Sequence, residues 1–404
     1  MTTRTPAPPA WIRVGELPGL DPVPPFTPLA ERSPAGLPQI LLPSGHTAVH
    51  LTRYRDVLAL LSDPGSGRAA TNVEGGPSFL PTTMPKELLL NLDAPDHARI
   101  RGFVSADYSA AGVERLRPVL DEVLGERVAA LRSSSSPDLF AEVADRVPIA
   151  VNCAFLGIPA EDVAYFRPSV RIVQIASHQD VPGLVGHFST VYRYLTDLVT
   201  GARPRVAGGL IDRFAEDRDR VEPPLSDAEL TGILFGSLLG ADQNIVSVLT
   251  KALYVLLAAP GLWERLAADP GIAPRLAEEL IRLIPLGAIS AFPRIAGRDL
   301  ETSEGTVPAG SVVYPDAFAA NRDPEVFPDP ELVDPDRPNV RRHLQFGYGM
   351  HHCMGAALAR IEIVAVLTRL ARELPGLRLD ADPAGLPWDE GTVLRRPTAL
   401  PVRW

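Results

Sequence analysis

Apolar residues return every three or four positions over most of the chain beyond residue 87, which is the spacing of amphipathic helices. These runs predict helices over residues 94–104, 110–131, 138–156, 161–174, 185–201, 210–219, 225–257, 273–283 and 353–374. Ser226 and Glu229 form a capping-box pattern at the start of the helix over 225–257. The chain is therefore predicted to be mainly α-helical.

Shorter stretches with alternating apolar and polar residues predict small β-sheets. Residues 38–51 hold two strand-like runs on either side of Ser44-Gly45, which is typical of a hairpin, and residues 294–313 alternate with turns. The tail towards Trp404 predicts a further strand pair. Residues 65–85 lack any period and predict a long loop, a feature that is uncommon in compact domains and often functional.

One domain accounts for most of the chain. No repeat or low-complexity linker interrupts residues 38–404, and their elements predict a mainly α fold with small β-sheets. Residues 1–37 are expected to form an extended N-terminal segment, whose proline-rich part runs over the surface. They lack the charged region and apolar core of a secretory signal. No apolar run approaches the roughly 20 residues that span a bilayer, so no membrane association is expected.

Composition narrows the class of protein further. The 404 residues are 46% hydrophobic and 22% charged, as in an ordinary globular protein. The net charge of −10 and the pI of about 5.4 argue against nucleic acid as a partner. The two cysteines, Cys153 and Cys353, are too few for a disulfide framework, so we expect a cytoplasmic protein, and we expect it to be a monomer.

The strongest chemical signal is a glycine-rich loop that ends in a cysteine. The pattern Phe-Gly-x-Gly-x-His-x-Cys-x-Gly is matched by Phe346, Gly347, Gly349, His351, Cys353 and Gly355. Two glycines spaced by one residue allow the loop to lie flat against a planar ligand. A helix that begins at Cys353 would aim its N-terminal amides at the sulfur and favour a thiolate. Such a thiolate is a suitable ligand for haem iron.

The loop resembles the haem-binding loop of the cytochrome P450 family. The resemblance covers residues 38–404 and implies a single-domain cytochrome P450 fold, a triangular helical prism around haem. It also implies haem b as the cofactor, Cys353 as the axial ligand of the haem iron, and an oxygen-dependent, monooxygenase-type oxidoreductase. The alternative is a structural cysteine at a helix start, with His351 and His352 holding zinc.

Electrons would come from NAD(P)H through separate redox partners, ferredoxin and ferredoxin reductase. The chain has no Gly-x-Gly-x-x-Gly fingerprint for a flavin or nicotinamide in a strand–helix setting. A local basic patch beside the cysteine loop would attract an acidic donor, and it consists of Arg341, Arg342 and Arg360.

Cationic residues at several places match the family's contacts to the haem propionates. His97 and Arg101 share one helical face at i, i+4, while Arg294 follows a proline break and His343 precedes the cysteine by ten residues. Buried propionates require such partners. A solvated charged face is the alternative for each residue alone. A further family feature is Glu279-x-x-Arg282 with an arginine of the later segment, Arg337 here, which would hold the haem face together.

The helix over 225–257 should cross the far side of the haem from the cysteine. Its centre carries the candidate catalytic residues Gly240, Asp242, Gln243 and Asn244 on an otherwise apolar helix. In the family an acid followed by a threonine relays protons at this place. The acid is present as Asp242, but Gln243 replaces the threonine, so ordinary hydroxylation should be inefficient. Family members without the threonine include several that couple their substrate oxidatively.

The substrate is expected to be a compact secondary metabolite. Candidate substrate contacts are amides, hydroxyls, cations and aromatic groups, namely Arg68, Phe79, Ser237, Ser290, Phe292 and Arg395. We expect oxidative C–C or C–N coupling, such as dimerisation, of a tryptophan-containing diketopiperazine (cyclic dipeptide). The alternatives are a conventional monooxygenase that hydroxylates or epoxidises a polyketide, macrolide or terpenoid, and a haem-binding sensor or carrier without turnover.

Overall fold

Helices dominate the computed structural model, which describes residues 12–20, 27–78, 83–175, 181–287, 289–389 and 393–404. In chain order they are α1 (Tyr54–Ser62), α2 (Asp96–Val104), α3 (Ala110–Glu114), α4 (Arg117–Ser133), α5 (Val147–Leu156), α6 (Val163–Ile175), α7 (Val181–Thr200), α8 (Leu210–Asp217), α9 (Asp227–Ala241), α10 (Gln243–Ala258), α11 (Pro260–Ala268), α12 (Ala273–Leu283), α13 (Ala317–Ala320) and α14 (Ala356–Glu373). The mainly α prediction is confirmed.

The strands form one larger sheet and two small pairs. The larger sheet has the order β1-β2-β3-β7-β4, in which β3 and β7 are parallel and the other neighbours are antiparallel. Its strands are β1 (Thr27–Pro28), β2 (Gln39–Leu41), β3 (Thr47–Leu51), β7 (Val312–Pro315) and β4 (Arg294–Ile295). The pairs are β5 (Leu300–Thr302) with β6 (Gly305–Val307), and β8 (Arg378–Leu379) with β9 (Val402–Arg403). The predicted hairpin over 38–51 is confirmed as β2–β3.

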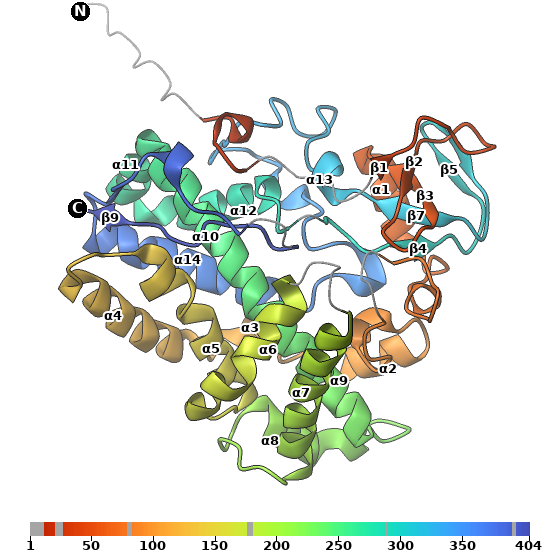
Figure 1. Cartoon of the computed structure of the whole chain (residues 1–404), viewed down its shortest axis with the longest axis horizontal. Helices are drawn as coiled ribbons and strands as arrows, with labels where there is room; N and C mark the ends of the chain where they lie inside the picture. Colours follow the sequence, from red (N-terminus) through yellow and green to blue (C-terminus); the bar gives the residue numbers. More distant parts are fainter. Residues whose placement is uncertain (1–11, 21–26, 79–82, 176–180, 288, 390–392) are drawn as a thin grey trace, which may run out of the picture.

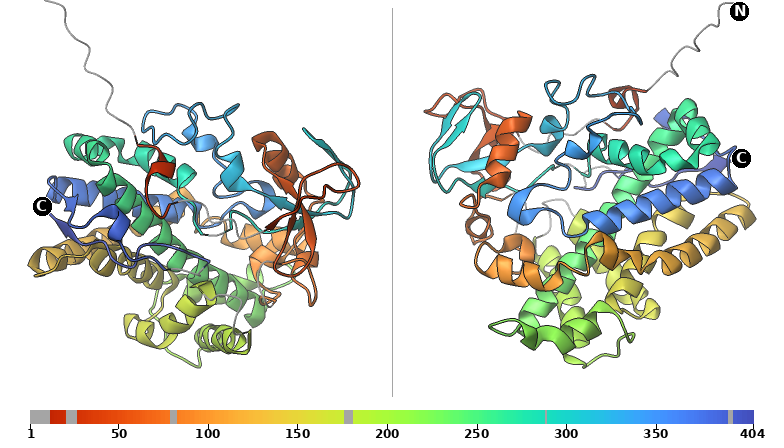
Figure 2. Two further views of the ribbon diagram at one scale, coloured as in Figure 1. Left: turned by 45° about the horizontal axis from the view of Figure 1, so that its top comes forward. Right: turned by 180° about the vertical axis from the view of Figure 1, so that it is seen from behind.

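Helices and sheet occupy different parts of the molecule. Figure 1 shows the larger sheet gathered with α1 at one side, while α4 to α12 and α14 fill the rest. The back view in Figure 2 shows α14 running along the helical part, where it packs against α12, α4 and α11. One apolar core joins most of these helices, and a smaller one lies under the sheet and α1. The protein therefore has the mainly α architecture with small sheets that its sequence predicts.

The predicted helix over 225–257 is two helices. The capping box at Ser226 and Glu229 is present, so the predicted start is confirmed. Asp242, however, has φ −85° and ψ −90°, which ends α9 and starts α10. The joined stretch Asp227–Ala258 is long and apolar enough to cross a membrane, contrary to the prediction, yet 67% of its most apolar window is buried inside the fold. A core helix of a globular protein has this burial.

Other boundaries also differ from the predictions. The predicted helix over 110–131 is α3 and α4, that over 138–156 is a π-turn at Phe140–Ala144 followed by α5, and α11 had no predicted counterpart. Residues 12–20 do not simply run over the surface, because Val14, Leu17 and Leu20 are buried in the main core. The first two turns of this segment therefore belong to the folded domain.

A buried ion network fixes α12 to the segment before the cysteine loop. Both carboxylate oxygens of Glu279 accept hydrogen bonds from Arg282, at 2.7 and 2.8 Å, and Arg337 Nε donates to Glu279 Oε1 at 3.0 Å. Glu279 and Arg282 are fully buried. Arg282 also donates to the carbonyl oxygens of Asn321 and Pro330. This network ties the approach to the cysteine loop to the helical core, as the sequence predicted.

Glu279→Gln should destabilise the protein by about 3 kcal/mol or more, because it leaves two buried guanidinium groups without their shared carboxylate. Chemical denaturation of the haem-loaded protein, followed by circular dichroism, measures the change. Glu114→Gln is the control, since the Glu114–Arg117 pair is exposed and should change the unfolding midpoint little. Equal midpoints for the two variants would contradict a structural role for the buried network.

Candidate functional site

The cysteine loop leads directly into α14. Its two glycines have left-handed backbone conformations, with φ 68° at Gly347 and φ 67° at Gly349. A Cβ on Gly349 would lie 2.3 Å from the carbonyl oxygen of Leu61 at the end of α1. The Cys353 backbone N–H donates to the Phe346 carbonyl at 2.8 Å, which closes the loop. The glycines therefore allow a tight turn packed against α1.

Cys353 lies three residues before the helix rather than at its first residue. α14 begins at Ala356 with Gly355 as its N-cap. Cys353 has exposed surface, yet the protein around its sulfur raises the pKa of the thiol above the ordinary value. Removal of the sulfur from water is the main cause, and the Gly355 N–H and the cations Arg101 and Arg360 only partly offset it. A metal cation bound to the sulfur would favour the thiolate, so the predicted thiolate stays a prediction for the haem-loaded protein.

A cluster of imidazole and guanidinium side chains lies beside this loop. His351 Nε2 contacts the Leu92 carbonyl oxygen at 2.7 Å, and Arg294 Nη1 donates to His351 Nδ1 at 3.0 Å. The His97 ring lies 4.7 Å from the His351 ring. Burial lowers the pKa of His97 to about 4 and that of His351 to about 3, with further lowering by neighbouring cations. The structure thus brings His97, Arg294 and His351 together.

The cluster holds more positive than negative charge. Arg68 and Arg294 are only 3% and 6% exposed, and the Nε atom of each is buried without a hydrogen-bond partner. The carboxylate that attracts both is Asp93, whose oxygens already accept the backbone N–H groups of Arg68 and Ala69. Buried cations in this state require anions. The donor set fits the two propionates of a haem held by the cysteine loop.

His343 does not join this cluster. Its Nε2 atom lies 3.0 Å from Glu278 Oε2, and its Nδ1 atom accepts the Gln345 backbone N–H. Burial opposes ionisation of Glu278, but the bonds from His343 and Arg360 outweigh it and hold the Glu278 pKa at about 2. Both ring nitrogens of His343 are therefore engaged within the chain, by Glu278 of α12 and the Gln345 backbone, and its predicted propionate contact stays a prediction.

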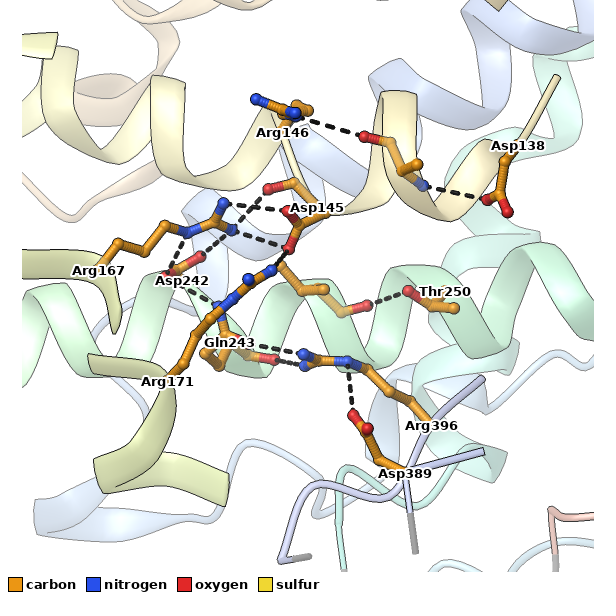
Figure 3. Close-up of polar contacts among 12 residues, drawn as sticks. Asp138, Asp145, Arg146, Arg167, Arg171, Asp242, Gln243, Thr250, Asp389 and Arg396 are labelled. Atoms are coloured by element: carbon orange, nitrogen blue, oxygen red, sulfur yellow. Dashed lines mark hydrogen bonds and ion pairs between the residues drawn. The ribbon is translucent and has the colours of Figure 1, made fainter. Parts of the chain in front are cut away.

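On the central helices, the candidate acid is fully buried and ion-paired. Arg167 of α6 donates from Nε to Asp242 Oδ2 at 3.1 Å and from Nη2 to Asp242 Oδ1 at 3.0 Å. Figure 3 shows this pair at the break between α9 and α10. Burial lowers the pKa of Arg167, but attraction to Asp242 outweighs it, so the pKa lies above its ordinary value. Both oxygens of Asp242 are thereby bonded by one guanidinium.

The amide of Gln243 is committed to two charged neighbours. Its Nε2 atom donates to Asp242 Oδ2 at 2.9 Å, and its Oε1 atom accepts from Arg396 Nη2 at 2.7 Å. Gly240 is accessible although Leu238 and Asp242 are buried, and a Cβ on it would meet no atom within 4 Å. Asn244 is half-buried beside them. Space therefore remains at Gly240, while the Asp242 carboxylate bonds Arg167 and the Gln243 amide oxygen bonds Arg396.

Several proposed substrate contacts are occupied by protein partners. The Ser237 hydroxyl accepts from Tyr108, Ser290 bonds Tyr314 and Asp316, and Arg395 donates to the Gly19 carbonyl. Arg68 and Phe292 are together, with the guanidinium 3.9 Å from the ring centre. Phe79 lies outside the described residues. The arginine pair itself is the sequence signal for this segment, and of its two members Arg395 is the candidate substrate contact, whereas Arg396 is the one that bonds Gln243.

Zinc is not supported as an alternative. Within the part of the chain that the structure describes, no group of three or more His, Cys, Asp or Glu side chains could hold a metal ion. The His351 nitrogens contact Arg294 and the Leu92 carbonyl. A single thiol with a facing anion-binding cluster suits haem instead.

Cys353→Ala should abolish the thiolate-type Soret band of the dithionite-reduced, carbon monoxide-bound protein, because no other described residue replaces its sulfur at the loop. Cys153→Ala is the control, since Cys153 is buried in α5 and burial raises its pKa to about 12. Absorbance spectra of both purified variants check this. A thiolate-type band that survives in Cys353→Ala would contradict the assignment.

Comparison with known proteins agrees with this geometry. The family model of cytochrome P450 matches residues 274–376. Nocardicin C N-oxygenase of Nocardia uniformis subsp. tsuyamanensis is 35% identical over 394 residues, covering 96% of this chain and 97% of that protein. Mycinamicin IV hydroxylase/epoxidase of Micromonospora griseorubida is 35% identical over 364 residues, covering 90% and 91%.

A solved structure is similar over nearly the same length. The crystal structure of cytochrome P450mel 107F1, described as having biaryl coupling reactivity, has a TM-score of 0.83 and 32% identity and covers 89% of this chain and 91% of its own. With a relative 35% identical over 96% of the chain, the chain belongs to the cytochrome P450 family of monooxygenases, which use haem b and electrons that reach it from NAD(P)H through redox partners.

Proposed function

We propose that this enzyme of secondary metabolism joins two aromatic units oxidatively. The specific candidate is C–C or C–N coupling, such as dimerisation, of a tryptophan-containing diketopiperazine. The observation that carries this proposal is the double engagement of Gln243, between Asp242 at 2.9 Å and Arg396 at 2.7 Å. Oxygen insertion and coupling both consume two protons per dioxygen, so proton demand alone does not separate them. What sets this chain apart from family members with an acid and a threonine is that Asp242 and Gln243 belong to one ion network.

The chain's own residues bind and orient rather than relay protons. Bound haem supplies the oxidising power, with dioxygen and two electrons from NAD(P)H. Asp242 is held by Arg167, and Gln243 offers neither a hydroxyl nor a free amide, so proton transfer by these side chains is disfavoured. Coupling removes one hydrogen atom from each of two substrate molecules and forms one bond between them, while dioxygen, two electrons and two protons complete two water molecules.

One candidate substrate contact, Phe292, favours an aromatic ligand. Its ring centre lies 3.9 Å from the guanidinium of Arg68, a member of the cation cluster that would hold the propionates. An aromatic ring beside such a guanidinium offers a flat apolar surface. The indole ring of a tryptophan-containing cyclic dipeptide would match this surface.

The second candidate is a conventional monooxygenase that hydroxylates or epoxidises a polyketide, macrolide or terpenoid. It is favoured by the relative named as a mycinamicin IV hydroxylase/epoxidase, whereas the structure with biaryl coupling reactivity favours coupling. Both relatives are similar to this chain to nearly the same degree. The choice between the two candidate functions therefore rests on the residues of α9 and α10.

Ferredoxin and ferredoxin reductase are the redox partners that we propose, with activity in the cytoplasm. Bacterial members of the family generally use them. Arg341 and Arg342 are exposed beside the cysteine loop, where an acidic donor could bind. Arg360 is half-buried against Glu278, so it contributes less to this surface than the sequence predicted.

Turnover with cyclo(Trp-Trp), ferredoxin, ferredoxin reductase and NADPH tests the proposal. Coupling predicts a product with twice the substrate mass less two hydrogens in the mass spectrum. A product heavier by one oxygen would favour the second candidate. Absence of any product, together with no substrate-induced change in the haem absorbance spectrum, would contradict a diketopiperazine substrate.

Gln243→Thr should shift products from coupling towards oxygen insertion, because it removes both amide bonds and restores a hydroxyl beside Asp242. The ratio of the two product masses measures the shift, and an unchanged carbon monoxide spectrum confirms that the haem site is intact. If both products keep their yields, Gln243 does not control the outcome.

A further inference from the structure

Arg396 of the C-terminal segment lies against the break between α9 and α10. Arg396 is 2% exposed, and its Nη2 and Nη1 atoms donate to Gln243 Oε1 at 2.7 Å and to the Gln243 carbonyl oxygen at 3.3 Å. Figure 3 shows the guanidinium of Arg396 lying against Gln243, with Asp389 on its other side. Two elements far apart in the sequence thus meet at the candidate catalytic residues.

Asp389, Asp145 and Asp242 attract this buried charge, while Gln243 provides its hydrogen bonds. Asp389 Oδ2 lies 3.7 Å from Arg396 Nε, which makes no hydrogen bond. Burial lowers the pKa of Arg396, and Asp389 only partly offsets this. A buried guanidinium needs acceptors with good geometry, and Gln243 supplies both of the hydrogen bonds described. A threonine at this position has a shorter side chain and no amide oxygen, so Gln243 and Arg396 depend on each other.

The orientation of the Gln243 amide follows from these neighbours. Only its oxygen can accept from a guanidinium, and only its nitrogen can donate to a carboxylate. The Arg396 bond therefore directs the amide nitrogen to Asp242 Oδ2, at 2.9 Å. Asp242 is in turn held by Arg167, which also bonds Asp145. Arg396 is therefore the last member of a buried hydrogen-bond network that runs from Asp145 through Arg167, Asp242 and Gln243.

The neighbouring arginine provides an internal contrast. Arg395 donates to the Gly19 carbonyl at 2.9 Å and lies 5.1 Å from the Trp388 ring. It carries the same charge on the same segment, yet its described contacts are with Gly19 and Trp388. Position on the segment alone therefore does not explain the contact that Arg396 makes.

We propose that Arg396 is a positioning residue that fixes the Gln243 amide and, through it, one oxygen of Asp242 at the break between α9 and α10. This deepens the proposed function and rests on it, because it names what holds the acid and its neighbour in place and so limits proton movement along the break. Without Arg396, the amide loses its oxygen partner and can rotate, and the Asp242 carboxylate loses a fixed donor. Water and protons can then pass along the break from Asp242.

The test uses haem-loaded enzyme and dioxygen, without substrate. Each variant is reduced with dithionite, freed of excess reductant and mixed with air-saturated buffer, and its reoxidation rate is followed by absorbance in H₂O and D₂O. Arg396→Gln should raise the rate several-fold and increase the solvent isotope effect, since proton delivery speeds this reaction. Arg395→Gln, the matched control, should behave as the unmodified enzyme does.

A second substitution distinguishes a specific effect of Arg396 on Asp242 from a general loss of packing at the helix break. In Arg396→Gln, a further Asp242→Asn change should return the rate to that of the unmodified enzyme. A gain that survives Asp242→Asn would overturn the proposal, as would equal rates for Arg396→Gln and Arg395→Gln. Arg396→Lys, which keeps the charge but not the forked donors, should give an intermediate rate and serves if Arg396→Gln binds no haem. Because no substrate is present, failure here leaves the coupling assay independent.

Discussion

Burial of one carboxylate inside an apolar helical core constrains this structure. Asp242 is fully buried between two apolar helices, and an unpaired charge there would cost several kcal/mol. Arg167 removes that cost with two hydrogen bonds. The pairing coincides with non-helical backbone at Asp242 and ties α6 to the break between α9 and α10. Gln243 and Arg396 then extend the same network to the C-terminal segment.

The opposite situation exists near the cysteine loop. Arg68, Arg294 and the neutral histidines His97 and His351 form a buried set with too little negative charge of its own. The Asp242 carboxylate is therefore paired within the chain, while the cation cluster requires an anionic ligand. We propose that the two sets of residues have different roles: the cation cluster would hold the cofactor, and the ion network around Asp242 would influence what the bound cofactor does.

The sequence predicted those features that depend on local pattern. The capping box at Ser226, the helix α12 and the Glu279–Arg282 pair follow from spacing within one element, and the cysteine loop from a specific motif. The break at Asp242 was not predicted, and the ion pair that coincides with it joins Asp242 to Arg167, 75 positions away in the sequence. The motif predicted His351 as well as His343, but it could not show that His351 bonds Arg294 whereas His343 bonds Glu278, nor that Arg396 bonds Gln243. Contacts between charged residues that are far apart in the sequence cannot be predicted from the periodicity of apolar residues.

The side chain of Gln243 is held by Arg396 and Asp242, and we propose that it keeps these partners when haem is bound. A high-resolution crystal structure of the haem-loaded enzyme measures this directly. We expect the Gln243 amide oxygen within hydrogen-bond distance of Arg396 and its nitrogen within the same distance of Asp242. A Gln243 amide turned towards the iron, with Arg396 bound to another acceptor, would contradict the account.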